Sequence, residues 1–524
     1  MSILNVEHLS HGFGDRAIFG DVSFRLLKGE HIGLVGANGE GKSTFLNIVT
    51  GKLQPDEGKI EWAKNVRVGY LDQHTVLEKG MTIQDVLKSA FAYLFELEEK
   101  MNTICDSLGD ADEEEMMTLM EELGTIQDTL TLHDFYVIDA KVEEVARALG
   151  LLDIGLEKDV TDLSGGQRTK VLLAKLLLEK PDILLLDEPT AALTDIEVEG
   201  LFQIIHKLTE EGKSVIFISH KMREVLQISD RITILRTGEV ITTLDRSETD
   251  GQELANLMIG RELAPSHYGK VEEPGDPVIQ MRSVDYHKES KHAGLSGVSL
   301  TVGRGEIVGI AGVDGNGQSQ LAQVVTGVLT PDGGEVDMKG SKVAQFTPNG
   351  FILENVSHIP EDRNKMGLIG NMSVKDNIVL KATDSPEFSS AKGYFLKKKA
   401  IRDYALKMQE KYDIRCTSVE QETRNLSGGN QQKVILAREL EGSPDLLVAV
   451  HPTRGLDIGA TRFVHDTMIE ARDKGCGVLL ISADFDEILE VSDRIVVMFE
   501  GQIMGVFSGK NPPIEEISLA MAGK

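Results

Sequence analysis

The chain has 524 residues, a formal net charge of −29 and only three scattered cysteines. Its length predicts two or more domains, because a single hydrophobic core stops growing well before this size. Such acidity argues against a broad grip on nucleic-acid phosphates, so no DNA partner is expected. Cys105, Cys416 and Cys476 have no metal spacing and fit a reducing, cytosolic setting. No apolar run approaches the about 20 residues that span a bilayer, so a membrane role would need a partner.

The first residues alternate short apolar runs with turns and predict an antiparallel start, followed by a buried strand over 32–35. After this strand come GANGEGKST, from Gly36 to Thr44, and a helical pattern from Phe45. A G-x-x-x-x-G-K-[ST] sequence between a strand and a helix is a strong signal for a loop that binds nucleoside triphosphate. The predicted nucleotide-binding residues are Gly36, Asn38, Gly39, Gly41, Lys42, Ser43 and Thr44.

Each residue type in this loop has a chemical reason. The glycines let consecutive backbone N–H groups point at an anion, Lys42 reaches the terminal phosphates, and the Ser43 hydroxyl can ligate Mg²⁺. Two roles fit Phe13, which precedes the loop: stacking on a purine base, or packing as an ordinary core residue. Two roles also fit Gln73, which ends the strand VRVGYLDQ: contact with Mg²⁺ or the attacking water, or a place on the surface.

Residues 82–150 follow a helical pattern, with apolar positions such as Met116 and Met120 at helical spacing. Between Phe91 and Leu130 there are twelve acidic residues and one basic residue, Lys100. This composition predicts a helical hairpin with a solvated acidic face and without catalytic content.

Two further signals lie between 162 and 220. Ser164, Gly165 and Gly166 open a helix, whose start is a natural anion site. The apolar strand over 183–186 delivers Asp187 and Glu188 at its carboxyl end, where parallel sheets bind ligands. Asp187 is predicted to hold Mg²⁺ and Glu188 to polarise the attacking water, while His220 ends the next strand and contacts the γ-phosphate. The predicted catalytic residues are thus Glu188, His220 and Gln73, and the predicted metal ligands are Ser43, Gln73 and Asp187.

The phosphate loop, the sequence LSGGQ and the strand that ends in Asp-Glu, in this order, resemble the ATP-binding cassette ATPases. The resemblance implies an α/β fold with two tandem P-loop cassettes, each with a mostly parallel sheet, an antiparallel β part and a helical part. It implies ATP and Mg²⁺ as cofactors. It also implies a head-to-tail cassette pair, with ATP held between the phosphate loop of one cassette and the LSGGQ serine of the other.

The chain repeats its own motifs, each 263 residues after its counterpart from the signature serine onward. The second copy keeps the pattern and loses the chemistry. Gln318 stands in place of the phosphate-loop lysine, Val450 and His451 replace the acidic pair, and Ala483 replaces the histidine. Losing one transition-state contact typically costs about 3–4 kcal/mol, so almost no hydrolysis is expected here. The predicted nucleotide-binding residues of this copy are Gly312, Gly315, Gly317 and Ser319, with Ser427, Gly428 and Gly429 in its LSGGN sequence.

These patterns predict a first cassette over 1–240, a linker over 241–275, a second cassette over 276–508 and a C-terminal tail over 509–524. If the cassettes pair within the chain, one composite site is complete: Lys42, Ser43, Gln73, Asp187, Glu188 and His220 face Ser427, Gly428 and Gly429. The other, with Gln318 and Val450 facing Ser164, is at most a nucleotide-holding site.

The two parts of the chain resemble different branches of the family. Residues 190–510, with ISHKMREV, MIGRE, IPEDRNKMGLI and PTRGLDIGA, resemble the tandem ATPase subunits of bacterial nucleoside and sugar importers. Residues 1–190, with VGYLDQHTVLEKGMTIQDVL and LSGGQRTKVLLAKLLLEKPDILLLDEPT, resemble the first cassette of ABC-F proteins, which are soluble ribosome-associated ATPases. The change falls inside LLLDEPT and suggests a hybrid joined there.

The importer resemblance implies a peripheral protein on the cytoplasmic face of the cell membrane. It would power nucleoside or sugar import through transmembrane permease subunits, with a substrate-binding lipoprotein upstream. One alternative is an ABC-F-like ATPase that acts on the ribosome, which the missing long charged linker and the acidity disfavour. The other alternative is an uncoupled hybrid ATPase.

Overall fold

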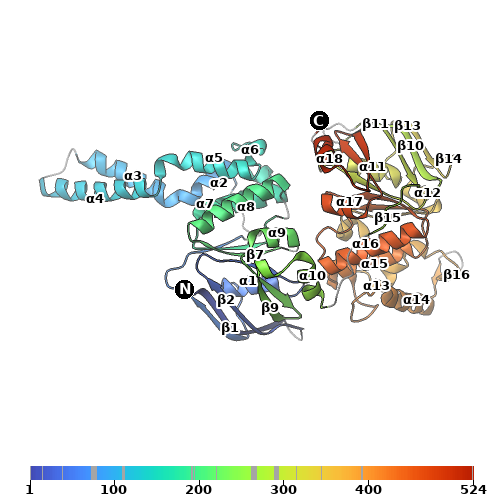
Figure 1. Cartoon of the computed structure of the whole chain (residues 1–524), viewed down its shortest axis with the longest axis horizontal. Helices are drawn as coiled ribbons and strands as arrows, with labels where there is room; N and C mark the ends of the chain where they lie inside the picture. The colour runs from blue at the N-terminus through green and yellow to red at the C-terminus, as the bar shows by residue number, and fades with distance from the viewer. Residues whose placement is uncertain are drawn as a thin grey trace. The chain divides into compact units, whose positions relative to one another are not determined.

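A computed structural model describes most of the chain as two compact units, Met1–Leu263 and Ala264–Lys524 (Figure 1). Both units are α/β, with a six-stranded sheet, a smaller antiparallel sheet and helices around them, so the predicted fold class is confirmed. The residues that the structure describes are 2–13, 16–37, 39–71, 79–108, 113–190, 193, 195–219, 221–260, 268–287, 294–313, 315–343, 345–390, 394–521 and 523.

The large sheet of the first unit has the strand order β5-β6-β7-β3-β8-β9, with an antiparallel pair only at β8–β9. Its inner strands are buried and mostly apolar, as is usual where helices cover both faces of a parallel sheet. The smaller sheet has the order β2-β1-β4 and is antiparallel. The strands are β1 (Ser2–Phe13), β2 (Arg16–Leu27), β3 (His31–Val35), β4 (Glu57–Trp62), β5 (Val68–Tyr70), β6 (Ile183–Asp187), β7 (Ser214–Ile218), β8 (Arg231–Arg236) and β9 (Glu239–Asp245).

The helices of the first unit include the predicted hairpin. Its two long helices, α3 and α4, lie side by side, and Lys100 of one pairs with Glu122 of the other (Figure 1). The helices are α1 (Lys42–Val49), α2 (Ile83–Lys88), α3 (Ala92–Ser107), α4 (Glu113–Leu132), α5 (Ile138–Ala148), α6 (Leu151–Ile154), α7 (Gly165–Glu179), α8 (Asp195–Glu210), α9 (Met222–Ile228) and α10 (Gly251–Ile259).

The second unit repeats the large sheet in the same spatial order, β15-β18-β19-β12-β20-β21. Its strands are β10 (Pro277–Tyr286), β11 (Leu295–Gly303), β12 (Ile307–Ala311), β13 (Gly333–Met338), β14 (Ser341–Lys342), β15 (Val356–Ile359), β16 (Ser389–Ser390), β17 (Phe395–Leu396), β18 (Leu446–Val450), β19 (Gly477–Ile481), β20 (Arg494–Phe499) and β21 (Gln502–Ser508). Its helices are α11 (Gln318–Val325), α12 (Pro348–Leu353), α13 (Val374–Ile378), α14 (Lys398–Lys411), α15 (Gly428–Leu440), α16 (Ile458–Asp473), α17 (Phe485–Val491) and α18 (Ile514–Met521).

The predicted linker, 241–275, is too long. Its first part is folded into the first unit, because β9 pairs with β8 and the buried Leu254 and Met258 of α10 pack inward. Arg236 also donates a hydrogen bond of 2.8 Å from Nη1 to the carbonyl of Leu257. The predicted tail, 509–524, likewise contains a helix, α18, whose Ile517 is fully buried.

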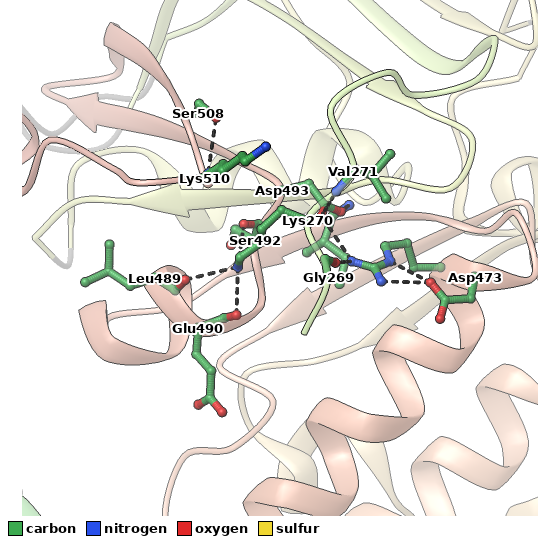
Figure 2. A network of polar contacts seen from close by, with 12 residues as sticks. Gly269, Lys270, Val271, Asp473, Leu489, Glu490, Ser492, Asp493, Ser508 and Lys510 are labelled. Carbon is green, nitrogen blue, oxygen red and sulfur yellow. Dashed lines mark hydrogen bonds and ion pairs between the residues drawn. The ribbon is translucent and has the colours of Figure 1, made fainter. Parts of the chain in front are cut away.

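The last part of the predicted linker is fixed to the second unit by polar contacts (Figure 2). Lys270 donates from Nζ to the carbonyls of Leu489, Glu490 and Ser492 at 3.1, 2.7 and 2.8 Å, at the carboxyl end of α17. Burial lowers the pKa of Lys270 to about 8. Side-chain donors at this position satisfy carbonyls that a helix end leaves free.

An ion pair buried in the second unit lies next to this contact. Arg472 donates from Nη1 to the carbonyl of Gly269 at 2.9 Å and to Oδ1 of Asp493 at 3.0 Å. Asp493 also accepts hydrogen bonds from the backbone N–H groups of Val271 and Ile307, at 2.8 and 2.7 Å. The side chains of Arg472 and Asp493 are only 5% and 1% exposed, so each charge depends on the other.

Within the described part of the chain, none of the helices has the length and apolar character that crossing a membrane requires.

Candidate active site

The phosphate loop of the first unit has the curled form that its sequence predicts. Strand β3 leads into Gly36, and α1 starts at Lys42, so the loop links a buried strand to a helix start. Gly39 and Gly41 have φ angles of 89° and 91°, which favour glycine. A Cβ atom at Gly36 would lie 2.4 Å from the carbonyl oxygen of Leu235, so only glycine fits there.

Lys42 is held inside this loop. Its side chain is buried, and Nζ donates to the carbonyl oxygens of Gly36 at 2.7 Å and Ala37 at 3.0 Å. A buried ammonium is costly unless it is hydrogen-bonded, and here the loop itself supplies the acceptors. The loop therefore holds the positive charge of Lys42 where the sequence predicts the terminal phosphates.

The end of β6 brings a carboxylate to the same loop. Asp187 is partly buried, which raises its pKa, while a hydrogen bond from the Ser43 hydroxyl and the charge of Lys42 act in the opposite direction. A serine hydroxyl beside an aspartate is a hard-oxygen donor set of the kind that Mg²⁺ prefers. The residues present thus fit the metal that the sequence implies.

Glu188 follows directly and has an unusual backbone. Its φ angle is 49°, in the left-handed region, and its N–H donates to the carbonyl of Ile218 at 2.9 Å. Such a conformation costs about 1–3 kcal/mol in a residue other than glycine and persists only where the surroundings enforce it. The bond to β7 holds the glutamate at the strand end.

Three predicted site residues, Asn38, Gln73 and His220, lie outside the described residues. Phe13 ends β1 with 54% of its surface exposed and an edge-on contact to His11 at 4.9 Å between ring centroids. That exposure argues against the ordinary core role. Purine stacking by Phe13 stays a prediction, as does nucleotide contact by Thr44.

The two signature serines begin their helices differently. Ser164 caps α7 reciprocally: its Oγ accepts from the N–H of Gln167 at 3.3 Å, and its own N–H donates to Gln167 Oε1 at 3.0 Å. Ser427 precedes α15 without a capping bond, and Asn430 donates from Nδ2 to its Oγ at 2.9 Å. Both serines are exposed, followed by first-turn glycines, Gly165 and Gly166 in one unit and Gly428 and Gly429 in the other.

The described residues of the second unit's phosphate loop follow those of the first, with Gln318 in place of the lysine. Gln318 is buried at the start of α11, and Nε2 donates to the carbonyl of Val313 at 2.9 Å. This matches the bond from Lys42 to Ala37, and the φ angles of Gly315 and Gly317, 95° and 99°, match as well. Gly312 and Ser319 flank this loop at the positions of Gly36 and Ser43.

The end of β18 in the second unit has the same backbone conformation as the end of β6 in the first. It lacks the carboxylate oxygens of Asp187 and Glu188. His451 has a φ angle of 45° and donates its N–H to the carbonyl of Ile481 at 2.7 Å, as Glu188 does to Ile218. Its Nδ1 accepts from the N–H of Ala483 at 3.1 Å. Val450, at the place of Asp187, is buried and apolar. The backbone scaffold is thus retained where the predicted chemistry is lost.

Strand register reveals one position that the sequence comparison missed. Tyr70 pairs with Leu185, and His358 pairs with Val448, so these two residues occupy the same place in their sheets. Counting three residues on from Tyr70 and three residues on from His358, Glu361 corresponds to Gln73. Glu361 accepts a hydrogen bond of 3.0 Å from Nη1 of Arg454.

A buried histidine–glutamate pair links α16 and α17 of the second unit. His465 of α16 is 3.0 Å from Glu487 Oε1 through Nε2 and 3.5 Å from Glu490 Oε2 through Nδ1. Burial alone would lower the pKa of His465, but the bonds to both carboxylates outweigh burial and raise the pKa to about 9. This imidazole is therefore charged in the folded chain at neutral pH.

We expect this pair to make the stability of the second unit depend on pH. Because the folded pKa, about 9, exceeds the ordinary 6.5, the stabilisation is complete below pH 6.5 and is lost as the pH rises through 9. The shift corresponds to about 3 kcal/mol. Urea unfolding from pH 6 to 10 should show this loss, and His465→Gln should flatten it. The exposed His287→Gln is the control, and an unchanged slope in His465→Gln would contradict the assignment.

Together, the curled loop, the serine–aspartate oxygen pair and the glutamate at the strand end define a P-loop nucleotide-binding protein, with the full set in one of two copies. Residues 19–191 and 295–454 match the family model described as ABC transporter. The chain belongs to this family, which consists of ATPases, and it is therefore an ATP-binding cassette ATPase.

Curated relatives extend over nearly the whole chain. The nucleoside import ATP-binding protein NupA of Lactococcus lactis is 35% identical and is matched over 100% of this chain and 98% of its own length. The uncharacterized ABC transporter ATP-binding protein YfmM of Bacillus subtilis is 40% identical over 94% of this chain and 97% of its own. The ribose import ATP-binding protein RbsA of Bacillus licheniformis is 32% identical over 99% and 100%.

Solved structures share the tandem architecture. An RNase-L inhibitor gives a TM-score of 0.66 at 20% identity, over 98% of this chain and 93% of its own. The archaeal ribosome recycling factor aABCE1, in complex with the ribosomal stalk protein aP1, gives 0.68 at 19% identity, over 98% and 92%. At this level of identity the likeness establishes the fold alone.

Proposed function

We propose that this chain is the ATP-hydrolysing subunit of an ABC importer that moves nucleosides or simple sugars through a separate permease. The observation that carries the proposal is the full-length likeness to importer ATP-binding proteins, with the nucleoside import protein NupA matched over 98% of its length. The ribose import protein RbsA, matched over its whole length, supports the sugar part of the proposal. Choice between these substrates would belong to the permease.

The side chains of the first unit each have a place in this reaction. Lys42, now bonded to two loop carbonyls, would exchange them for oxygens of the terminal phosphates. Ser43 and Asp187 would hold Mg²⁺, which when bound offsets phosphate charge. Glu188 would orient the attacking water and draw off its proton, and His220 would contact the γ-phosphate.

We also propose that the two cassettes pair within the chain around nucleotide. In the complete composite site, the first phosphate loop and its strand ends would meet Ser427, Gly428 and Gly429. In the other, the loop of Gly312, Gly315, Gly317 and Ser319 would meet Ser164, Gly165 and Gly166. The retained curl of the second loop supports nucleotide holding there, and the absence of charge at Gln318 supports slow or no turnover.

The partners follow from the importer proposal. Permease subunits would bring the chain to the cytoplasmic face of the cell membrane, and a substrate-binding lipoprotein would act upstream. The division of the sequence near residue 190 into importer-like and ABC-F-like parts stays a prediction, and so does the question of which partner the first unit docks.

Reconstitution with a membrane partner tests the proposal. The purified chain is added to vesicles that contain a nucleoside permease, and ATP hydrolysis and uptake of labelled uridine are followed. We expect co-purification with the permease, faster hydrolysis in its presence, and uptake that Glu188→Gln abolishes. Co-sedimentation with ribosomes and no permease binding would favour the ABC-F-like alternative. Binding to neither, with hydrolysis intact, would identify an uncoupled ATPase, and both outcomes overturn the importer proposal.

A further inference from the structure

A buried carboxylate joins two of the strand ends at which the predicted catalytic residues of the first unit lie, those of β6 and β7. Glu224, in the first turn of α9, is only 5% exposed. Its Oε2 accepts hydrogen bonds from the hydroxyls of Thr190 and Ser219, each at 2.7 Å. Both hydroxyl residues are also buried, at 2% and 0% exposure. A hydroxyl–carboxylate bond of this length is charge-assisted and stronger than a neutral one.

The two hydroxyl residues lie next to predicted catalytic residues in the sequence. Thr190 lies two residues after Glu188, and Ser219 directly precedes His220. Backbone contact links the same segments, since the N–H of Glu188 donates to the carbonyl of Ile218 at 2.9 Å. The carboxylate of Glu224 therefore ties the segment that follows the catalytic glutamate to the segment that leads to the predicted γ-phosphate contact.

The second unit provides an internal comparison. Glu487 is the counterpart of Glu224, and it is 3% exposed on α17. Its Oε1 is committed to His465 of α16, while Oε2 has no hydrogen-bond partner among the described residues. In the first unit, the position of His465 is held by Phe202, which packs edge-on against Phe217 at 5.9 Å between ring centroids.

The different bonding of Glu224 and Glu487 distinguishes a role in packing from a role in function. Both units bury a glutamate at the same place, so burial of a carboxylate alone is a shared structural feature. In the unit with the complete nucleotide motifs, this carboxylate accepts hydrogen bonds from the two hydroxyls that follow β6 and β7. In the second unit, the carboxylate is hydrogen-bonded to His465 of α16 instead.

We infer that Glu224 is a positioning residue for ATP hydrolysis: its carboxylate holds Thr190, two residues after Glu188, and Ser219, the last described residue before the predicted γ-phosphate contact. The inference rests on the role proposed above for the first unit. It requires no permease, because it concerns only hydrolysis by the purified chain. Failure of the importer proposal would leave it standing.

Removing one hydroxyl at a time tests the inference. Thr190→Val keeps the shape of the side chain and deletes the donor, and Ser219→Ala deletes the other. We expect each to lower kcat about tenfold or more with KM for ATP changed less than twofold, because a misplaced catalytic group costs rate rather than binding. Thr190→Ser restores the hydroxyl and should keep most of the activity.

Two further variants separate positioning from stability. Glu224→Gln offers a neutral acceptor that bonds more weakly, so kcat should again fall more than KM rises. Glu487→Gln makes the same change in the second unit and should leave kcat within twofold of the original chain. Thermal unfolding of every variant is recorded in parallel.

Three results would overturn the inference. One is a Thr190→Val variant that unfolds at a lower temperature and yet hydrolyses ATP at the original kcat. Another is equal loss of kcat in Thr190→Ser and Thr190→Val, since the first retains the hydroxyl. The third is a Glu487→Gln variant that loses as much kcat as Glu224→Gln, which would reduce both glutamates to general supports of the fold.

Discussion

Glu188→Gln should reduce ATP turnover by the purified chain by at least about a hundredfold, whereas His451→Gln should leave turnover within twofold. The amide keeps the size of the side chain and removes the carboxylate that would draw a proton from water, a contribution typically worth 10²- to 10⁴-fold. Both residues share the same left-handed backbone and the same bond to the neighbouring strand. The comparison thus changes chemistry at two matched sites.

Phosphate release under saturating ATP and Mg²⁺ measures this difference, and nucleotide binding to each variant shows whether the site still loads. Glu188→Gln should bind ATP at least as well as the original chain, because the glutamate is assigned to the reaction and not to phosphate binding. Equal loss from the two substitutions would refute the assignment of hydrolysis to the first unit alone.

Arg472→Leu should destabilise the second unit by about 3–5 kcal/mol, because it leaves Asp493 charged and buried without its ionic partner. Asp493 is 1% exposed and would keep the backbone donors of Val271 and Ile307, with the charge of Lys270 as its remaining cationic neighbour among the described residues. The carbonyl of Gly269 would lose its donor as well, so the segment that joins the units should loosen.

Calorimetry checks this expectation through the unfolding transition of the second unit, which should fall by roughly 10 °C, at about 2–4 °C per kcal/mol for a unit of this size. Lys474→Met is the matched control, since Lys474 pairs with Glu470 on the exposed surface of the same helix end. Exposed pairs of this kind contribute about 0.2–1 kcal/mol. A shift no larger than that of the control would show that the buried pair is dispensable.

The local parts of the site could be predicted from the sequence because short motifs dictate them. The phosphate loop needs glycine at the positive φ angles of Gly39 and Gly41, and the apolar strand before Asp187 sets where that carboxylate ends. The exchange of Lys42 for Gln318 in the repeat was equally readable. These features depend on neighbours within a few residues of one another.

Contacts between distant segments were not predictable in the same way. The bonds that Thr190 and Ser219 donate to Glu224 link α9 to the segments after β6 and β7. The equivalence of Glu361 with Gln73 required strand register. The predicted linker includes α10, which belongs to the first unit, although the sequence carries signals for this helix. Asp250 caps the start of that helix by accepting from the N–H of Glu253, and Gly260 ends it with a φ angle of 78°.

The amide of Gln318 has a consequence for how the second unit could have diverged. This neutral group reproduces one of the two bonds that the Lys42 ammonium makes in the first unit, so the loop keeps part of its internal support without the charge. Exchange of the lysine at such a place would cost the fold little, so selection on the second unit would need to maintain only its structural role. A loop of this kind can then accumulate further substitutions while the fold of the unit is maintained.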